Sequence, residues 1–91
     1  MIYKYTSKEI CEKTVQNWGR DSQLLMVLEE MSELQKEILK NMNRHKDNVK
    51  EIAEETADVL IMMERLIYIY KIEDLVTQQA ELKVNRLKQY L

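Results

Sequence analysis

The chain contains no proline and a single glycine, Gly19, and this shortage of helix-breaking residues is its strongest constraint. Proline and glycine are the residues that most often punctuate a chain with turns and loops. A chain of 91 residues with so little punctuation favours long helices joined by few turns. We therefore expect one all-α domain that spans residues 1–91, without a linker or a low-complexity tract.

The first helix is expected between two recognisable signals. Thr6 followed three residues later by Glu9 has the spacing of a capping box, in which two side chains satisfy the free N–H groups of a helix start. Gly19 is a plausible stop, because glycine readily adopts the left-handed conformation that ends many helices. The first helix is therefore predicted to run to about Trp18.

Three further helices follow from apolar residues that recur at helical spacing. The second fades in the polar segment 41–47, which is the best candidate for a loop. The third is expected to run to about Tyr70, and the fourth occupies the C-terminal part. Their predicted caps are Asp21 or Ser22, Asn48 and Asp74. The predicted subunit is a bundle-like set of four helices in up-and-down order.

The third helix is apolar around most of its circumference. A helix of this kind is usually buried on most sides, and one copy of so short a chain can hardly supply that cover. We expect self-association as a symmetric dimer or a dimer of dimers, that is, a homodimer or homotetramer. A monomer with an unusually apolar helix is the alternative. The main apolar face comprises Ile52, Thr56, Val59, Leu60, Met63, Leu66, Ile67 and Tyr70.

Two pairs of carboxylates occupy corresponding places on the second and third helices. Glu30 with Glu33, and Glu55 with Asp58, are spaced as neighbours on a helix surface. In an antiparallel hairpin the two pairs lie at about equal distances from the loop centre near Arg44, so they are level. Four converging carboxylates provide hard oxygen ligands suited to Mg²⁺ or Mn²⁺. The alternative is a solvated acidic face, since a third of the chain is charged.

Net charge, apolar stretches and cysteine content limit which partners and which cellular compartment we expect for the chain. The formal net charge of −2 gives no general attraction for nucleic acid or for an acidic membrane. The apolar stretch 59–72 is interrupted by Glu64 and Arg65, so no membrane span is expected. Cys11 is the only cysteine, which excludes an intrachain disulfide and fits a reducing cytoplasm. The N-terminus lacks the apolar stretch of a signal peptide, and a cytoplasmic protein is expected.

The acidic segments carry a family resemblance. The run 29–33, EEMSE, followed by the run 55–58, ETAD, resembles the EExxE…ExxD signature of the MazG-like all-α nucleoside triphosphate pyrophosphohydrolases. The flanking residues fit as well, with Trp18-Gly19 and the apolar run 24–28 before the first acids. The C-terminal run 83–87, KVNRL, resembles the basic segment that closes short members of that family. The resemblance covers about residues 15–90.

The resemblance implies that the chain cleaves a nucleoside triphosphate between the α and β phosphates, giving a monophosphate and pyrophosphate. It implies that Glu30, Glu33, Glu55 and Asp58 bind Mg²⁺, for which Mn²⁺ can substitute. Glu29 would support a further metal or orient the attacking water. A metal neutralises phosphate charge and acidifies bound water, which suits this reaction.

Substrate contacts are expected from residues near both ends of the chain. Lys83 and Arg86 can hold phosphates, with solvent-facing charges as the alternative. Gln23 and Asn85 can hydrogen-bond a base or sugar, or be ordinary surface amides. Trp18 can stack on a base, or be a buried anchor between helices.

Three classes of function remain open at this stage. The first is the Mg²⁺-dependent nucleoside triphosphate pyrophosphohydrolase, acting in control or cleaning of a nucleotide pool. The second is a non-catalytic helical oligomer that binds a nucleotide or metal. The third is a purely structural helical oligomer.

Overall fold

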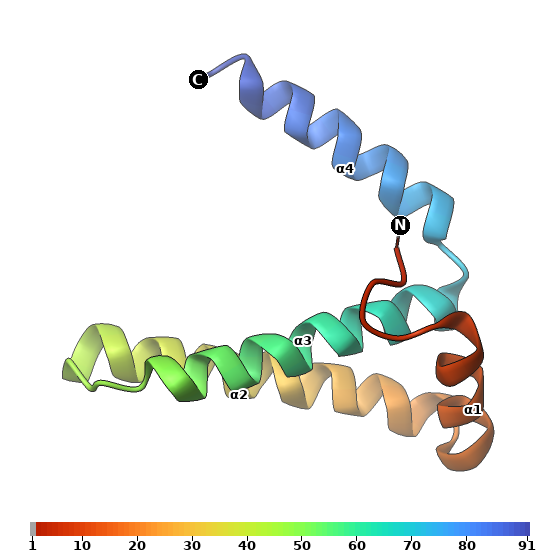
Figure 1. Ribbon diagram of the computed structural model, residues 1–91, viewed down its shortest axis with the longest axis horizontal. Coiled ribbons are helices and arrows are strands. Elements are labelled where there is room, and N and C mark those ends of the chain that lie inside the picture. Colours follow the sequence, from red (N-terminus) through yellow and green to blue (C-terminus); the bar gives the residue numbers. More distant parts are fainter. Residues whose placement is uncertain (1) are drawn as a thin grey trace.

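The computed structural model describes residues 2–91, and this part of the chain is all-α, as expected, with no strand. Helices α2 and α3 form a long hairpin, α1 packs against its open end, and α4 leaves that end at an angle (Figure 1). Within the described residues, no helix combines the length and the apolarity that crossing a bilayer requires. The four helices are α1 (Lys8–Trp18), α2 (Arg20–Arg44), α3 (Val49–Tyr70) and α4 (Glu73–Lys88).

The start of α1 differs from the predicted capping box. Ser7, not Thr6, is the N-cap, and its hydroxyl accepts a hydrogen bond from the backbone N–H of Ile10 at 3.1 Å. Gly19 ends α1 as predicted, with a φ of 89° that favours glycine. It also directly precedes α2, so the predicted caps Asp21 and Ser22 lie inside that helix. Helix α4 likewise begins after Ile72, and the predicted cap Asp74 is an internal residue of its first turn.

Asn48 precedes α3 as predicted, but its side chain serves the hairpin loop instead of capping the helix. The side chain is fully buried, and its Nδ2 donates to the backbone carbonyl of Glu37 at 2.8 Å and to Glu37 Oε1 at 3.2 Å. Asn41 Nδ2 in turn donates to Asn48 Oδ1 at 3.2 Å. These bonds attach the start of α3 to the last turns of α2. They fix the register of the two helices.

Polar groups fill much of the contact between α2 and α3. Buried or half-buried positions on α2 recur every three or four residues, which is the spacing of a coiled-coil seam. The matching stripe of α3 carries Glu55, Asp58, Met62 and Arg65, so the acids lie on the face that meets α2. We call this contact the polar seam. Its α2 residues are Gln23, Val27, Glu30, Leu34, Glu37 and Asn41.

Apolar side chains, by contrast, lie mostly outside. Among the described residues, the buried apolar side chains are Cys11, Val27 and Met62. Next to the polar seam, Leu24, Leu28 and Met31 of α2 form a groove of about 300 Å³ with Leu66 and Tyr70 of α3. Farther along α2, Ile38 and Met42 are 40% and 64% exposed. We call these seven residues the apolar face; a single copy of the chain leaves it in contact with water.

The expected up-and-down order holds for α2 and α3, but α4 does not lie alongside them in one chain. None of its residues is buried, and Figure 1 shows it diverging from the hairpin along its length. The turn before it passes through Lys71, whose φ is 54°. In an isolated copy, the bundle is therefore a hairpin with a crossing helix and a projecting arm.

Replacing Asn48 by alanine should destabilise the protein by about 1–3 kcal/mol, because it removes the two buried hydrogen bonds that Asn48 Nδ2 donates to the backbone carbonyl and to Oε1 of Glu37. Urea unfolding followed by circular dichroism measures the change. Asn43→Ala is the matched control, since Asn43 is exposed near the same end of α2 and should change stability by less than about 0.5 kcal/mol. Equal effects from the two substitutions would contradict this account of the loop.

Candidate metal centre

The centre of the polar seam brings together three carboxylates from two helices. Glu30 comes from α2, and Glu55 and Asp58 come from α3. One oxygen atom from each lies within 4.8 Å of the others. Glu55 and Asp58 are three residues apart and therefore share a face of α3, and the register of the hairpin places Glu30 level with them. We call these three residues the carboxylate cluster.

The electrostatics of the carboxylate cluster are unfavourable in the absence of a cation. Burial, and then the negative charges of Asp58 and Glu55, raise the pKa of Glu30 above its ordinary value. Glu55 Oε2 is buried without a hydrogen-bond partner within the described chain. A buried acceptor without a partner costs about 1–3 kcal/mol, and more when it is charged. The cluster thus has an acceptor to satisfy and negative charge to offset.

The donor set fits a hard divalent cation. All three groups are carboxylates, and Mg²⁺ prefers such oxygen ligands while it retains waters at its other positions. Asp58 is exposed, so the cluster opens to solvent on one side, where an ion and its remaining ligands can enter. Exposed acidic groups often gather without an ion, so the unpartnered oxygen of Glu55 is the observation that distinguishes this cluster from a charged surface.

Two of the predicted site residues lie outside the carboxylate cluster. Glu33 Oε1 is 3.3 Å from Lys36 Nζ, and the Glu33 side chain is half exposed. Glu29 is exposed on α2. The structure therefore joins Glu30, Glu55 and Asp58 but not Glu33, which was predicted as the fourth ligand.

For each of the two predicted contacts near the start of α2, the structure excludes the non-functional alternative that the sequence left open. Gln23 is not a surface amide: it is fully buried, and its Oε1 accepts a hydrogen bond from Arg65 Nη1 at 2.8 Å. In this structure it therefore belongs to the polar seam. Trp18 is 61% exposed at the end of α1, so the alternative of a buried anchor between helices is wrong for the single chain.

The predicted substrate contacts on α4 lie in two different grooves. Lys83 and Arg86 line a shallow groove together with Tyr90. Asn85 lines a different groove with Val84. Because α4 projects away from the hairpin, none of the predicted contacts on it is brought to the carboxylate cluster of the same chain (Figure 1).

Two buried charges were noted in the sequence only as interruptions of an apolar stretch. Glu64 is 4% exposed and accepts hydrogen bonds from the segment before α1, while Arg65 is 8% exposed and binds Gln23. Adjacent opposite charges within an apolar helix indicate that the charges are buried and paired, because a buried charge requires a partner. The partners themselves lie far away in the sequence, so periodicity does not identify them.

No protein-family model matches the chain, and neither the curated proteins nor the solved structures include one with significant similarity to it. The functional argument therefore depends on the carboxylate cluster and its surroundings.

Removing the charge of Glu30 should stabilise the cation-free protein at neutral pH. A carboxyl whose pKa is raised on folding opposes folding when it is ionised, so its cost is present above the raised pKa and absent below the unfolded one. Glu30→Gln should raise the midpoint of urea unfolding at pH 7 in the presence of a chelator. It should also abolish the rise in Tm that we expect Mg²⁺ to produce in the parent protein.

Glu54→Gln is the control for this experiment, because Glu54 is an exposed acid of α3 outside the carboxylate cluster. It should leave the Mg²⁺ response intact. A parent protein whose Tm does not respond to Mg²⁺ or Mn²⁺ would contradict the metal assignment.

Proposed function

We propose that the chain is a Mg²⁺-dependent nucleoside triphosphate pyrophosphohydrolase of the MazG-like type. It would cleave an NTP or dNTP between the α and β phosphates, yielding a monophosphate and pyrophosphate. The observation that carries the proposal is the convergence of Glu30, Glu55 and Asp58, with the partnerless Oε2 of Glu55 among them. These residues are three of the four at which the EExxE…ExxD resemblance expects metal ligands, the fourth being Glu33. The motif and the packing thus support the same assignment by independent routes.

The chain's own residues have distinct roles in this proposal. Glu30, Glu55 and Asp58 hold the cation at the middle of the hairpin, and the polar seam on both sides keeps their backbones in register. Glu33 lies one turn farther along α2, about 5–6 Å from Glu30 between Cβ atoms, and can supply a further ligand when it leaves Lys36. Glu29 remains the proposed support for a second ion or for the attacking water.

The proposed reaction requires positioning and charge neutralisation more than covalent chemistry by the protein. When bound, Mg²⁺ neutralises phosphate charge and acidifies water. The protein contributes a fixed set of acids whose mutual repulsion a bound cation would relieve. It also contributes cations for the outer phosphates, proposed to be Lys83 and Arg86.

Self-association is part of the same proposal. The apolar face leaves side chains such as Leu28 and Met42 more than 60% exposed, and burying apolar surface gains about 25 cal/mol per Å². Two hairpins placed face to face would cover it and make a bundle of four long helices. Since α4 does not reach its own carboxylate cluster, a second copy is also the proposed source of Lys83 and Arg86. The assembly is a symmetric dimer or a dimer of dimers.

Activity is tested by release of pyrophosphate from a panel of normal and modified nucleotides with Mg²⁺ or Mn²⁺. Asp58→Asn and Glu30→Gln should each reduce kcat by at least about 100-fold, because each removes a proposed metal ligand. Glu54→Gln, an acid of the same helix outside the carboxylate cluster, should retain activity. A protein that releases no pyrophosphate from any member of the panel would refute the reaction.

The dependence on self-association is tested on the apolar face, away from the carboxylates. Leu28→Glu places a charge in the groove of the apolar face and should convert the assembly to monomers, measured by analytical ultracentrifugation. Activity should fall with the loss of assembly, and dilution of the parent should have the same effect. Lys50→Glu, at an exposed polar position, is the control. Full activity in a proven monomer would show that one chain suffices.

A non-catalytic oligomer that binds a nucleotide or metal is the alternative. It shares the carboxylate cluster and the apolar face, so only turnover separates it from the enzyme. Nucleotide binding measured by calorimetry, without release of any product, would favour it.

A further inference from the structure

The segment before α1 is tied to a buried charge on α3. Glu64 is 4% exposed, and its Oε2 accepts the backbone N–H groups of Lys4 at 3.2 Å and Tyr5 at 2.9 Å. Its Oε1 accepts the N–H and the hydroxyl of Thr6, each at 2.8 Å. Burial alone would raise the pKa of Glu64, but the bonds from Tyr5, Thr6 and Lys4 outweigh it and hold the pKa below its ordinary value. The carboxylate is thus satisfied by a backbone loop instead of a cation.

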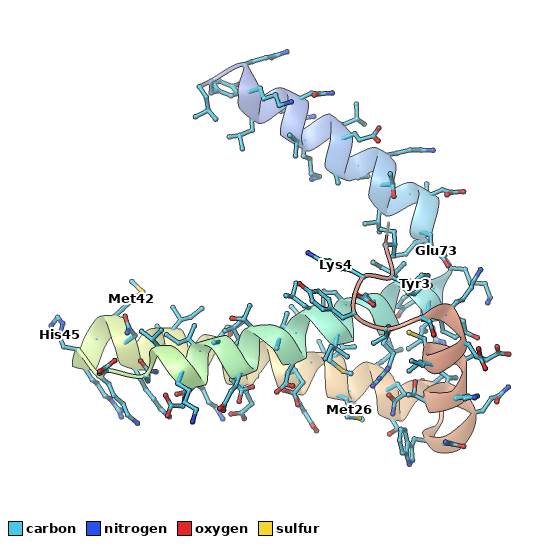
Figure 2. All side chains as sticks on the ribbon, viewed as in Figure 1. Tyr3, Lys4, Met26, Met42, His45 and Glu73 are labelled. Atoms are coloured by element: carbon cyan, nitrogen blue, oxygen red, sulfur yellow. The ribbon has the colours of Figure 1, made fainter. Side chains whose placement is uncertain are left out.

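The same segment also reaches the first residue of α4. Tyr3 Oη donates a hydrogen bond to Glu73 Oε2 at 2.9 Å, and Lys8 Nζ lies 3.7 Å from the same oxygen. Figure 2 shows Tyr3 and Glu73 together where α4 leaves the hairpin, with Lys4 on the inner side of that corner. Residues 3–6 therefore bond to both sides of the corner, and we call them the strap.

Few other contacts fix the angle of α4. The helix buries none of its residues, and its start lacks a side-chain cap. The turn at Lys71 and Ile72 is held by backbone bonds to the carbonyls of Tyr68 and Ile67, each at 3.2 Å. Those bonds end α3 but do not extend along α4. The hydrogen bonds of the strap are accordingly the main interactions, apart from the turn itself, that hold α4 at its angle to the hairpin.

The angle matters because of where the arm would otherwise go. Asp58 precedes Ile72 by the same number of residues as Arg86 follows it. An α4 folded back along α3 would therefore bring Arg86 level with Asp58, where opposite charges attract. The strap lies in the angle between α3 and α4, which would have to close for α4 to fold back.

We propose that the strap holds α4 open, with Glu64 as a positioning residue, and so prevents Lys83 and Arg86 from closing onto the carboxylate cluster of their own chain. The orientation itself does not depend on catalysis. Its consequence, that the two cations are left for a second copy, rests on the proposed function.

The test measures the direction of α4 directly, without nucleotide or metal. Spin labels at Ala57→Cys and Lys88→Cys, both exposed positions, would approach each other if α4 folded back along α3. The native Cys11 is fully buried and should take no label, which the unsubstituted protein verifies. Dilution of labelled chain with excess unlabelled chain confines the dipolar signal to distances within one copy.

The parent should give one long distance. Glu64→Gln replaces an acceptor oxygen by a donor facing N–H groups, and it should add a population at shorter distance. Tyr3→Phe removes only the bond to Glu73 and should broaden the distribution to a lesser degree. Glu54→Gln, an exposed acid of the same helix, should reproduce the parent distance.

Circular dichroism first establishes that each variant is folded. If Glu64→Gln does not fold, the distances measured in Tyr3→Phe alone test whether the strap holds α4 open. Parent-like distances in the folded strap variants would overturn the proposal, whatever the activity assays show. A shift in distance in a protein that releases no pyrophosphate would support the strap and refute only the proposed function.

Discussion

The contact between α2 and α3 determines the rest of the molecule, because it is polar where most helix contacts are apolar. Asn48 binds Glu37 near the loop, and Arg65 binds Gln23 near the open end. Between these two hydrogen-bonded layers lie the three acids of the carboxylate cluster. Directional bonds at both ends hold the helices in one register, and that register forces like charges together in the middle. The protein thus accepts local repulsion at the position where a cation would be most strongly attracted.

The arrangement of apolar groups follows from the same contact. Since the polar seam occupies the space between the helices, residues such as Leu28 and Met31 turn to the side and remain in water. Burial of apolar area is the main favourable contribution to folding, and one copy of this chain uses little of it. Self-association would supply that contribution and could bring α4 to a neighbouring hairpin. The polar contact between α2 and α3 therefore affects the stability of the protein and also the proposed origin of the residues in its site.

The sequence predicted the features that depend on local periodicity. The helices, the stop at Gly19 and the level placement of Glu30 with Glu55 and Asp58 all follow from spacing along the chain. The features that spacing could not predict involve distant partners. Thr6 was predicted as a cap, but its N–H and hydroxyl bind Glu64. Gln23 was predicted to contact a base or sugar, with an ordinary surface amide as the alternative, because its periodicity gives no hint of Arg65 across the hairpin.

The hydrogen bonds of the strap also set an order of events during folding. They join residues that are 58 to 70 positions apart, whereas the hairpin closes through a short loop. Closing a longer loop costs more conformational entropy, and such contacts form later. Residues 3–6 are also synthesised before these partners, and they cannot form the bonds until Glu64 and Glu73 have left the ribosome. The hairpin and its carboxylate cluster are thus expected to form while the arm is still free to swing.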